Sequence, residues 1–400
     1  MGRLGGRGDR ELGNEEGDRL AVRWCDSVRR VALLLTGWIF GLIAFAHVTA
    51  LGEEAAGWKQ AVGPRAWEFP RDHGAHPEYR TEWWYFTGNL ADSSGTRYGY
   101  QLTFFRQGIR REPVEPGNPW SVRDVNLAHF AISDASSGRF LWSERASRAG
   151  PGLAGASEAG MDVWVLQWSA RMQGASITLE ARDSDKALHL TMRPRKPVVL
   201  HGREGLSQKG PNHGQASYYA SFMNLETEGT IRTRQDGPEI PVRGTSWFDH
   251  EFGSNQLGSD QAGWDWFSLH LSDERDLMVY FLRLRDGSIE PASSGTLVEP
   301  DGSARHLVLS DIRVSALDRW NSPRSGGVYP SRWRVQVPSA DVDVEVSPLL
   351  PDQELRTEGS TGVTYWEGAV LGRGSSGGRT VTCEGYVELT GYAGGIGGLF

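Results

Sequence analysis

Short apolar and aromatic runs, separated by glycine, aspartate, serine and proline, make up the chain from about residue 66 onward. Runs that alternate between apolar and polar residues and end at turn residues predict antiparallel β-strands. A helical period is nearly absent from this part of the sequence. The 51 glycines suit tight reversals, and the 16 tryptophans suit half-buried strands. The sequence therefore predicts an all-β protein.

The predicted strands form two sets, one on either side of Asp236-Gly237-Pro238, where turn residues cluster. A chain of 400 residues is long enough for two domains with separate cores. We therefore expect two antiparallel β-barrels packed together, over residues 66–236 and 239–395, with residues 51–65 as a linker. Within the first set, Thr81 to Leu90 and Tyr98 to Arg106 flank the turn sequence DSSGT and predict a hairpin.

Residues 1–50 have the layout of a secretory signal. Arg29 and Arg30 precede an apolar run from Val31 to Ala46, and small residues lead to Ala50. This layout predicts export, with cleavage after Ala50, to the periplasm or the medium. The stretch from Val31 to Leu51 is also long enough to remain in a membrane as an anchor, so the sequence leaves that alternative open.

Charge and cysteine content exclude several classes of function. The 42 basic and 50 acidic residues give a net charge of −8, and no basic tract is present, which argues against nucleic-acid binding. Cys25 precedes the apolar run, and Cys383 lies in a strand-like segment. We therefore expect no disulfide framework and no cysteine-based metal site, and we predict no cofactor.

The segment GTSWFDHEFG, from Gly244 to Gly253, is the strongest candidate for chemistry because Asp249, His250 and Glu251 stand side by side among aromatic residues. Desolvation against aromatic rings favours the neutral form of a carboxyl group, which then becomes a proton donor near neutral pH. Adjacent residues on a strand point to opposite faces, so the three cannot easily chelate one ion. The alternative is a solvated turn closed by Gly253.

A second candidate is the strand-like segment GWDWFSLHL, in which Trp264, Trp266, Ser268 and His270 share one face. A face that mixes aromatic and polar groups suits a ligand cavity better than a dry core. By the same alternation, Glu388 in GYVELTGY could point into the same chamber. The alternative places these polar side chains on the solvent side.

Three other patterns are weaker. His73 and His76, with Glu78, lie in a Gly- and Pro-containing loop and make a poor metal site, so we predict no metal. Arg80 and Glu82 are candidates for a structural ion pair near a barrel floor, beside a Trp pair for which core packing is favoured over ligand contact.

Hydrolysis is the remaining chemistry to weigh. The one G-x-S-x-G string, at residues 374–378, falls in a Gly/Ser/Arg stretch that predicts a hairpin loop and not a nucleophile elbow, so a nucleophilic serine is not expected. Two carboxylates could serve glycoside hydrolysis, with Asp249 or Glu251 paired with Glu367 or Glu388, but only at a suitable separation.

Several long segments together resemble the carotenoid 1,2-hydratase (hydroxyneurosporene synthase) family, and more closely its secreted, AttH-like branch. They are FPRDHGAHPEYRTEWWYFTGNL, VLHGREGLSQKG, SYYAS, GTSWFDHEFG, GWDWFSLHL, YWEGAV and GYVELTGY. The resemblance covers about Trp67 to Tyr392 and implies two lipocalin-like (calycin-type) barrels. It also implies acid chemistry on an isolated double bond, and related lipocalin-like proteins act as pericyclases.

The resemblance assigns the acid to Asp249, because the family's Tyr-x-Asp motif matches Trp247-Phe248-Asp249. The family's upstream His-x-Trp element is replaced here by Tyr218-Tyr219-Ala220-Ser221, a departure that bears on carotenoid hydration itself. Trp247 offers a ring face to a cation but cannot pass on a proton as tyrosine can.

These observations predict a protein that binds an apolar small molecule, isoprenoid or lipid-like, at the interface or mouth of the barrels. If it is catalytic, we expect cofactor-free hydration of a C=C bond with Asp249 as acid and Tyr219, His250 or Glu251 placing water. A non-catalytic carrier, or a cyclase, isomerase or hydrolase on the same scaffold, is the alternative. The expected ligand-binding residues are Trp84, Trp247, Trp264, Trp266, His270, Trp366 and Glu388.

Overall fold

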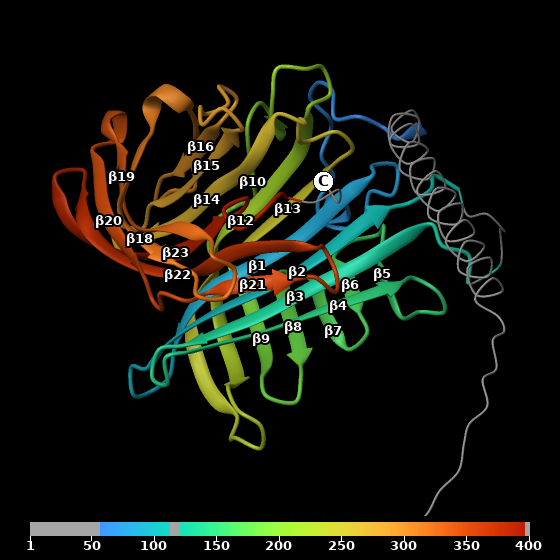
Figure 1. The fold of residues 1–400 in the computed structure, drawn as a ribbon, viewed down its shortest axis with the longest axis horizontal. Coiled ribbons are helices and arrows are strands. Elements are labelled where there is room, and N and C mark those ends of the chain that lie inside the picture. Colours follow the sequence, from blue (N-terminus) through green and yellow to red (C-terminus); the bar gives the residue numbers. More distant parts are fainter. Residues whose placement is uncertain (1–56, 113–117, 119, 397–400) are drawn as a thin grey trace, which may run out of the picture. The chain divides into compact units, whose positions relative to one another are not determined.

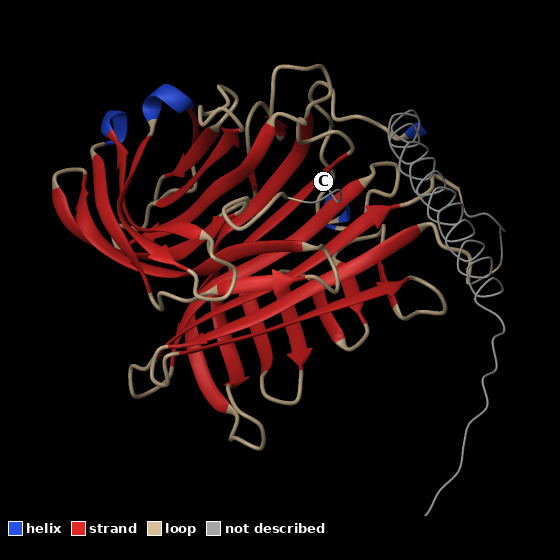
Figure 2. Cartoon of the chain, in the orientation of Figure 1, coloured by secondary structure: helices blue, strands red, loops and turns tan. Residues whose placement is uncertain are grey.

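The computed structural model describes residues 57–112, 118 and 120–396 (Figure 1). In this part of the chain nearly all regular structure is β-strand, as Figure 2 shows, so the all-β prediction is confirmed. The helical elements described are three short 3₁₀ turns, η2 (Arg71–His73), η3 (Leu309–Asp311) and η4 (Pro338–Ala340). None of the described helices has the length and apolar character needed to cross a membrane. The predicted leader, residues 1–50, lies outside the described residues.

The first barrel-like sheet has 13 strands, in the order β4-β3-β2-β1-β13-β12-β9-β8-β7-β6-β5, with β10 and β11 paired to β12. Its strands are β1 (Thr81–Ala91), β2 (Arg97–Gly108), β3 (Asp124–Asp134), β4 (Arg139–Arg148), β5 (Ala154–Ala156), β6 (Asp162–Val165), β7 (Trp168–Gln173), β8 (Ser176–Arg182), β9 (Ala187–Pro194), β10 (Val199–Leu200), β11 (Leu206–Gln208), β12 (Ala216–Arg232) and β13 (Ile240–Gly253). Strands β1 and β2 pair antiparallel, as the predicted hairpin requires.

The second barrel-like sheet has 10 strands, in the order β17-β16-β15-β14-β23-β22-β20-β19-β18, with β21 paired to β22. Its strands are β14 (Gln261–Leu271), β15 (Asp276–Leu284), β16 (Ser294–Val298), β17 (Ala304–Val308), β18 (Arg313–Asn321), β19 (Val328–Val337), β20 (Val342–Pro348), β21 (Glu354–Thr357), β22 (Val363–Ser376) and β23 (Arg379–Leu389).

The chain changes sheets later than the sequence predicts. The turn at Asp236-Gly237-Pro238 joins β12 to β13, and β13 lies in the first sheet between β1 and β12. The turn cluster is therefore a hairpin loop, and the second sheet begins only at Gln261. Part of the predicted linker also packs on the structure, because Trp58 and Ala61 are buried. Turn residues mark reversals equally well inside a sheet and between sheets, so composition alone could not place the junction.

Each sheet fills its own interior with side chains. Trp168, Phe130 and Leu190 belong to the core of the first sheet, and Trp333, Val344 and Val387 to that of the second. Alternate residues of these strands point outward, and outward residues of β1, β12, β13, β14, β15, β22 and β23 meet between the two sheets. Because both interiors are occupied, space for a ligand is found between the sheets.

The two sheets approach closely where β1 and β2 meet β22 and β23. The Asn89 side-chain amide donates a hydrogen bond of 2.9 Å to the carbonyl oxygen of Gly385. A Cβ atom on Gly99 would lie 2.5 Å from the Cβ of Ala369 and 3.2 Å from the hydroxyl of Tyr386. Glycine is therefore required at position 99 for this contact, which holds the two walls of the cavity described below in place.

Candidate active site between the two sheets

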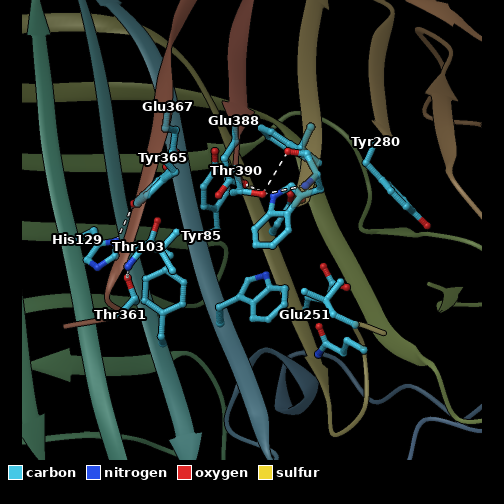
Figure 3. Close-up of a pocket in the computed structure, with 18 of the residues that line it drawn as sticks. Tyr85, Thr103, His129, Glu251, Tyr280, Thr361, Tyr365, Glu367, Glu388 and Thr390 are labelled. Atoms are coloured by element: carbon cyan, nitrogen blue, oxygen red, sulfur yellow. Dashed lines mark hydrogen bonds between the residues drawn. The ribbon is translucent and has the colours of Figure 1, made fainter. Parts of the chain in front are cut away.

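A cavity lies between the outward faces of the two sheets (Figure 3). Its total empty space, which includes the part open to solvent, is about 930 Å³. Aromatic and aliphatic side chains line most of it, together with a few ionisable groups. The lining residues are Trp83, Tyr85, Gln101, Thr103, Phe105, His129, Lys209, Tyr219, Asp249, Glu251, Gln256, Leu257, Trp264, Trp266, Tyr280, Leu282, Thr361, Val363, Tyr365, Glu367, Glu388 and Thr390.

Strand alternation decides which predicted residues reach this cavity. On β13, Asp249 and Glu251 face the cavity, whereas His250 between them points into the first sheet. On β14, Trp264 and Trp266 line the cavity. Tyr219 on β12 and Glu388 on β23 do so as well. The structure thus brings together six of the residues predicted from sequence, from the consecutive strands β12, β13 and β14 and the distant strand β23.

Asp249 is a carboxyl group at the cavity wall that accepts three hydrogen bonds from neighbouring side chains. Only 3% of its surface is exposed. It accepts hydrogen bonds from the Tyr219 hydroxyl at 2.6 Å, the Trp247 indole N–H at 2.7 Å and the Ser221 hydroxyl. Burial raises the pKa of Asp249 to about 7, with a further contribution from the nearby Glu251, against the three hydrogen bonds that lower it. Asp249 is therefore poised to exchange a proton near neutral pH.

Two of these donors extend the network. The Tyr219 hydroxyl also accepts a hydrogen bond of 3.2 Å from the Trp266 indole N–H. The Ser221 hydroxyl lies 2.7 Å from Nε2 of His201, whose pKa burial lowers to about 3. His201 is therefore neutral at ordinary pH. Sequence reasoning missed Ser221 and His201, although Ser221 shares a strand face with Tyr219, two residues away.

A buried ion pair lies beside Asp249. The Lys209 ammonium is 2.9 Å from a carboxylate oxygen of Glu251 and 4.2 Å from the centre of the Tyr280 ring. The Ser217 hydroxyl donates to the same carboxylate. Burial lowers the pKa of Lys209, but Glu251 and then Tyr280 outweigh burial and raise it, so Lys209 is a cation. The sequence offers no signal for Lys209, which lies in a loop after β11.

Glu367 and Glu388 form a second acidic group in the cavity. They are direct neighbours across β22 and β23. The Trp264 indole N–H donates to Glu388 at 3.0 Å, and burial raises the pKa of Glu388 to about 7. Glu367 is 1% exposed, and burial followed by the charge of Glu388 raises its pKa well above the usual range, against an opposing effect of Tyr85. That effect is a weak hydrogen-bonding interaction with the Tyr85 hydroxyl, and no group of the described residues lies at normal hydrogen-bond distance from either Glu367 oxygen.

The other five predicted site residues lie outside the cavity lining. Trp84 and Trp366 are 1% exposed and belong to the cores of the first and second sheets. The ring nitrogen Nδ1 of His270 bonds to Asp276 at 2.7 Å, away from the aromatic walls. Trp247 acts on the site indirectly, through its hydrogen bond to Asp249. Trp83, the neighbour of Trp84, faces the cavity instead.

His250 belongs to a separate buried network with His76 and Glu82. One Glu82 oxygen lies 2.9 Å from Nδ1 of His76 and 2.9 Å from Nε2 of His250, and the other accepts a hydrogen bond of 3.0 Å from Arg106. Arg106 also bonds to Asp124. The sequence points to Arg80 as the partner of Glu82, whereas the ion pair that the structure shows for Glu82 is with Arg106.

The grouping of His76, Glu82 and His250 has the residue types of a metal site. The other ring nitrogens are also engaged, since Nδ1 of His250 bonds to the Asp72 carbonyl and Nε2 of His76 lies 3.3 Å from the Asp72 carboxylate. Each potential ligand atom already has a hydrogen-bond partner, and the Arg106 cation supplies the positive charge. The hydrogen bonding therefore favours a structural network over metal binding.

Comparison with known proteins agrees with this architecture. The AttH-like family model matches residues 60–392. A solved protein of Nitrosomonas europaea described as an AttH has 34% sequence identity and a TM-score of 0.74, over 84% of this chain and 99% of that chain. The kievitone hydratase of Nectria haematococca has 15% identity and a TM-score of 0.62, over 84% of this chain and 97% of that chain.

No curated protein matches the chain significantly in sequence. The similarity to kievitone hydratase, at 15% identity, extends to the fold alone. The family model and the Nitrosomonas europaea structure each span most of the chain, and the fold of that structure matches the two barrel-like sheets. The chain therefore belongs to the AttH-like family.

Proposed function

We propose that the cavity between the sheets binds an apolar small molecule of isoprenoid or lipid-like character, and that Asp249 catalyses cofactor-free hydration of a C=C bond in it. The observation that carries the proposal is the position of Asp249, which is a buried carboxyl group with a pKa of about 7 in a cavity walled by Trp264 and Trp266. A carboxylic acid that is neutral at ordinary pH can deliver a proton to carbon, whereas an ordinary aspartate is already ionised.

The proposed reaction conserves atoms and charge. The acid form of Asp249 protonates one alkene carbon, and the other carbon becomes a cation beside the indole rings of Trp264 and Trp266, whose faces attract positive charge. Water adds to the cation. Its surplus proton restores the acid form of Asp249, and the carboxylate of Glu251, held by Lys209, orients the water.

The fold shared with kievitone hydratase supports a hydration reaction only at the level of scaffold. Incubation of the purified protein with an acyclic terpenoid in heavy-oxygen water, followed by mass spectrometry, tests the proposal directly. Incorporation of one heavy oxygen into the product supports hydration. Tight binding of the terpenoid without any product supports instead the second candidate, a carrier that uses the same apolar cavity.

The rate of hydration is expected to depend on pH through Asp249. The acid form prevails below its pKa of about 7. We expect kcat/KM to be level in mildly acidic buffer and to fall about tenfold per pH unit well above neutrality. Glu388 titrates in the same range, so the profile of Glu388→Gln is the control. If kcat/KM of Glu388→Gln still falls above neutral pH, the ionisation belongs to Asp249. If that fall disappears in Glu388→Gln, the assignment to Asp249 is wrong.

The same raised pKa affects stability with a defined sign. The folded state holds the Asp249 proton more tightly than the unfolded chain. The stabilisation is therefore complete below the ordinary value of 3.8 and is lost as pH rises through about 7.

We further propose that the protein is exported. The support is the arginine-flanked apolar run that ends near Ala50. N-terminal sequencing of protein recovered from the periplasm or the medium is expected to begin close to Leu51. Recovery of the intact chain from the membrane fraction would instead establish that residues 31–51 anchor it.

A further inference from the structure

The Glu367 carboxyl group is a buried polar group that the described residues satisfy poorly, through a weak interaction with Tyr85. Glu367 is 1% exposed and lines the cavity, yet both of its oxygens lack a partner at normal hydrogen-bond distance among those residues. The hydroxyl of Tyr85, another lining residue, interacts weakly with Glu367 but also has no described partner at normal hydrogen-bond distance. Buried polar atoms are nearly always satisfied in folded proteins, so exceptions that face a cavity point to a ligand.

Comparison with Glu354 shows that this is not a general property of buried glutamates in the chain. Glu354 on β21 is 0% exposed, but its carboxylate accepts hydrogen bonds from Ser322 at 2.8 Å, from Tyr329 at 2.9 Å and from Ser325. Its partners account for its burial. Glu367, at the same depth, has none of these.

The charges around Glu367 restrict what it can bind. Its direct neighbour across β22 and β23 is Glu388, and Figure 3 shows the two at the same end of the view, apart from Glu251. Two carboxyl groups this close do not both ionise readily, so a proton is retained between them. Lys209 is the one lysine or arginine among the described lining residues, and it is paired with Glu251. An anionic ligand head would therefore meet acidic groups with no cation to offset them.

We propose that Glu367, with Tyr85 beside it, is the polar anchor of the ligand, and that it binds a neutral oxygen, a carbonyl or hydroxyl, on an otherwise apolar molecule. This assignment deepens the proposed function, on which it rests, by naming the substrate class. The protonated carboxyl donates a hydrogen bond to the ligand oxygen, and the apolar body extends along the aromatic walls toward Asp249. Fatty acids and prenyl phosphates are excluded because their heads are anionic.

Calorimetric titration with four acyclic isoprenoid probes tests the assignment: the C18 ketone farnesylacetone, the C15 alcohol farnesol, the C15 acid anion farnesoate and the C15 hydrocarbon β-farnesene. We expect the ketone and the alcohol to bind, and farnesoate to bind at least about tenfold more weakly, because its carboxylate meets uncompensated acids. Glu367→Met removes the donor at similar volume. This substitution should lower the affinity for farnesylacetone and farnesol by about three- to tenfold and leave the affinity for β-farnesene unchanged. Glu367→Gln, which keeps a donor, should restore most of the affinity.

Thermal unfolding without ligand provides a second readout that does not depend on the choice of probe. Glu367→Met removes a poorly satisfied buried carboxyl group and should raise the melting temperature. Glu354→Met leaves the hydroxyls of Ser322, Tyr329 and Ser325 without their acceptor and should lower the melting temperature. Equal binding of farnesylacetone by wild type and Glu367→Met, or equal binding of farnesoate and farnesol, would overturn the anchor while the proposed function stands. Failure of all four probes to bind would overturn the proposed function and the anchor with it.

Discussion

Replacement of Asp249 by asparagine is expected to abolish hydration while leaving the protein folded and able to bind its ligand. Asparagine has nearly the same shape and can still accept hydrogen bonds from Trp247 and Ser221, but it carries no acidic proton. Positioned acid catalysis contributes a factor of about 10² to 10⁴, so the loss of kcat should be of that size. The affinity for the substrate should change little, because the apolar walls remain in place.

Asp265→Asn is the matched control for this experiment. Asp265 lies on the same strand as Trp264 and Trp266 but on the opposite face, where it bonds to Arg283 and Tyr392. Its replacement is expected to affect stability and to leave activity per folded molecule unchanged. Turnover by a well-folded Asp249→Asn variant at the wild-type rate would contradict the acid role. In that case the carrier becomes the better description.

Glu82→Gln is expected to destabilise the protein strongly without touching the cavity. The Glu82 carboxylate accepts hydrogen bonds from His76, His250 and Arg106, and all four side chains are buried. The amide of glutamine carries no negative charge, and its N–H donor group would face the N–H donors of His76, His250 or Arg106. Removing one partner from a buried ionic network typically costs about 3–5 kcal/mol, so the free energy of unfolding in urea should fall by about that amount.

Glu78→Gln provides the comparison, because Glu78 makes a more exposed pair with Lys59 at 3.9 Å. A change below about 1 kcal/mol is expected there. The fully buried network also depends on pH. Hydrogen bonds from His250 and His76 outweigh burial and lower the pKa of Glu82, so its stabilisation is lost as pH falls through the acid range.

Zinc addition separates the structural interpretation of this network from a metal site. A structural network should show no change in melting temperature when zinc is added to the wild type. A zinc-dependent rise that disappears in Glu82→Gln would show that His76, Glu82 and His250 bind the ion.

The sequence by itself determined the fold class and much of the acidic site. Alternation along GWDWFSLHL placed Trp264 and Trp266 on one face, and both tryptophans line the cavity, although His270 on the same face does not. The same alternation separates Asp249 and Glu251 from His250. Local patterns of this kind follow from strand geometry, which is the same wherever the strand lies.

Tertiary structure alone decided which faces meet. Lys209 and His201 lie far from Glu367 in the chain, and the proximity of all three to the cavity depends on how the two sheets pack. The position of β13 in the first sheet follows from pairing with β1 and β12, which no local pattern encodes. The aromatic pattern likewise could not distinguish the buried Trp84 from its cavity-lining neighbour Trp83, because a strand defines two faces but not what will cover each of them.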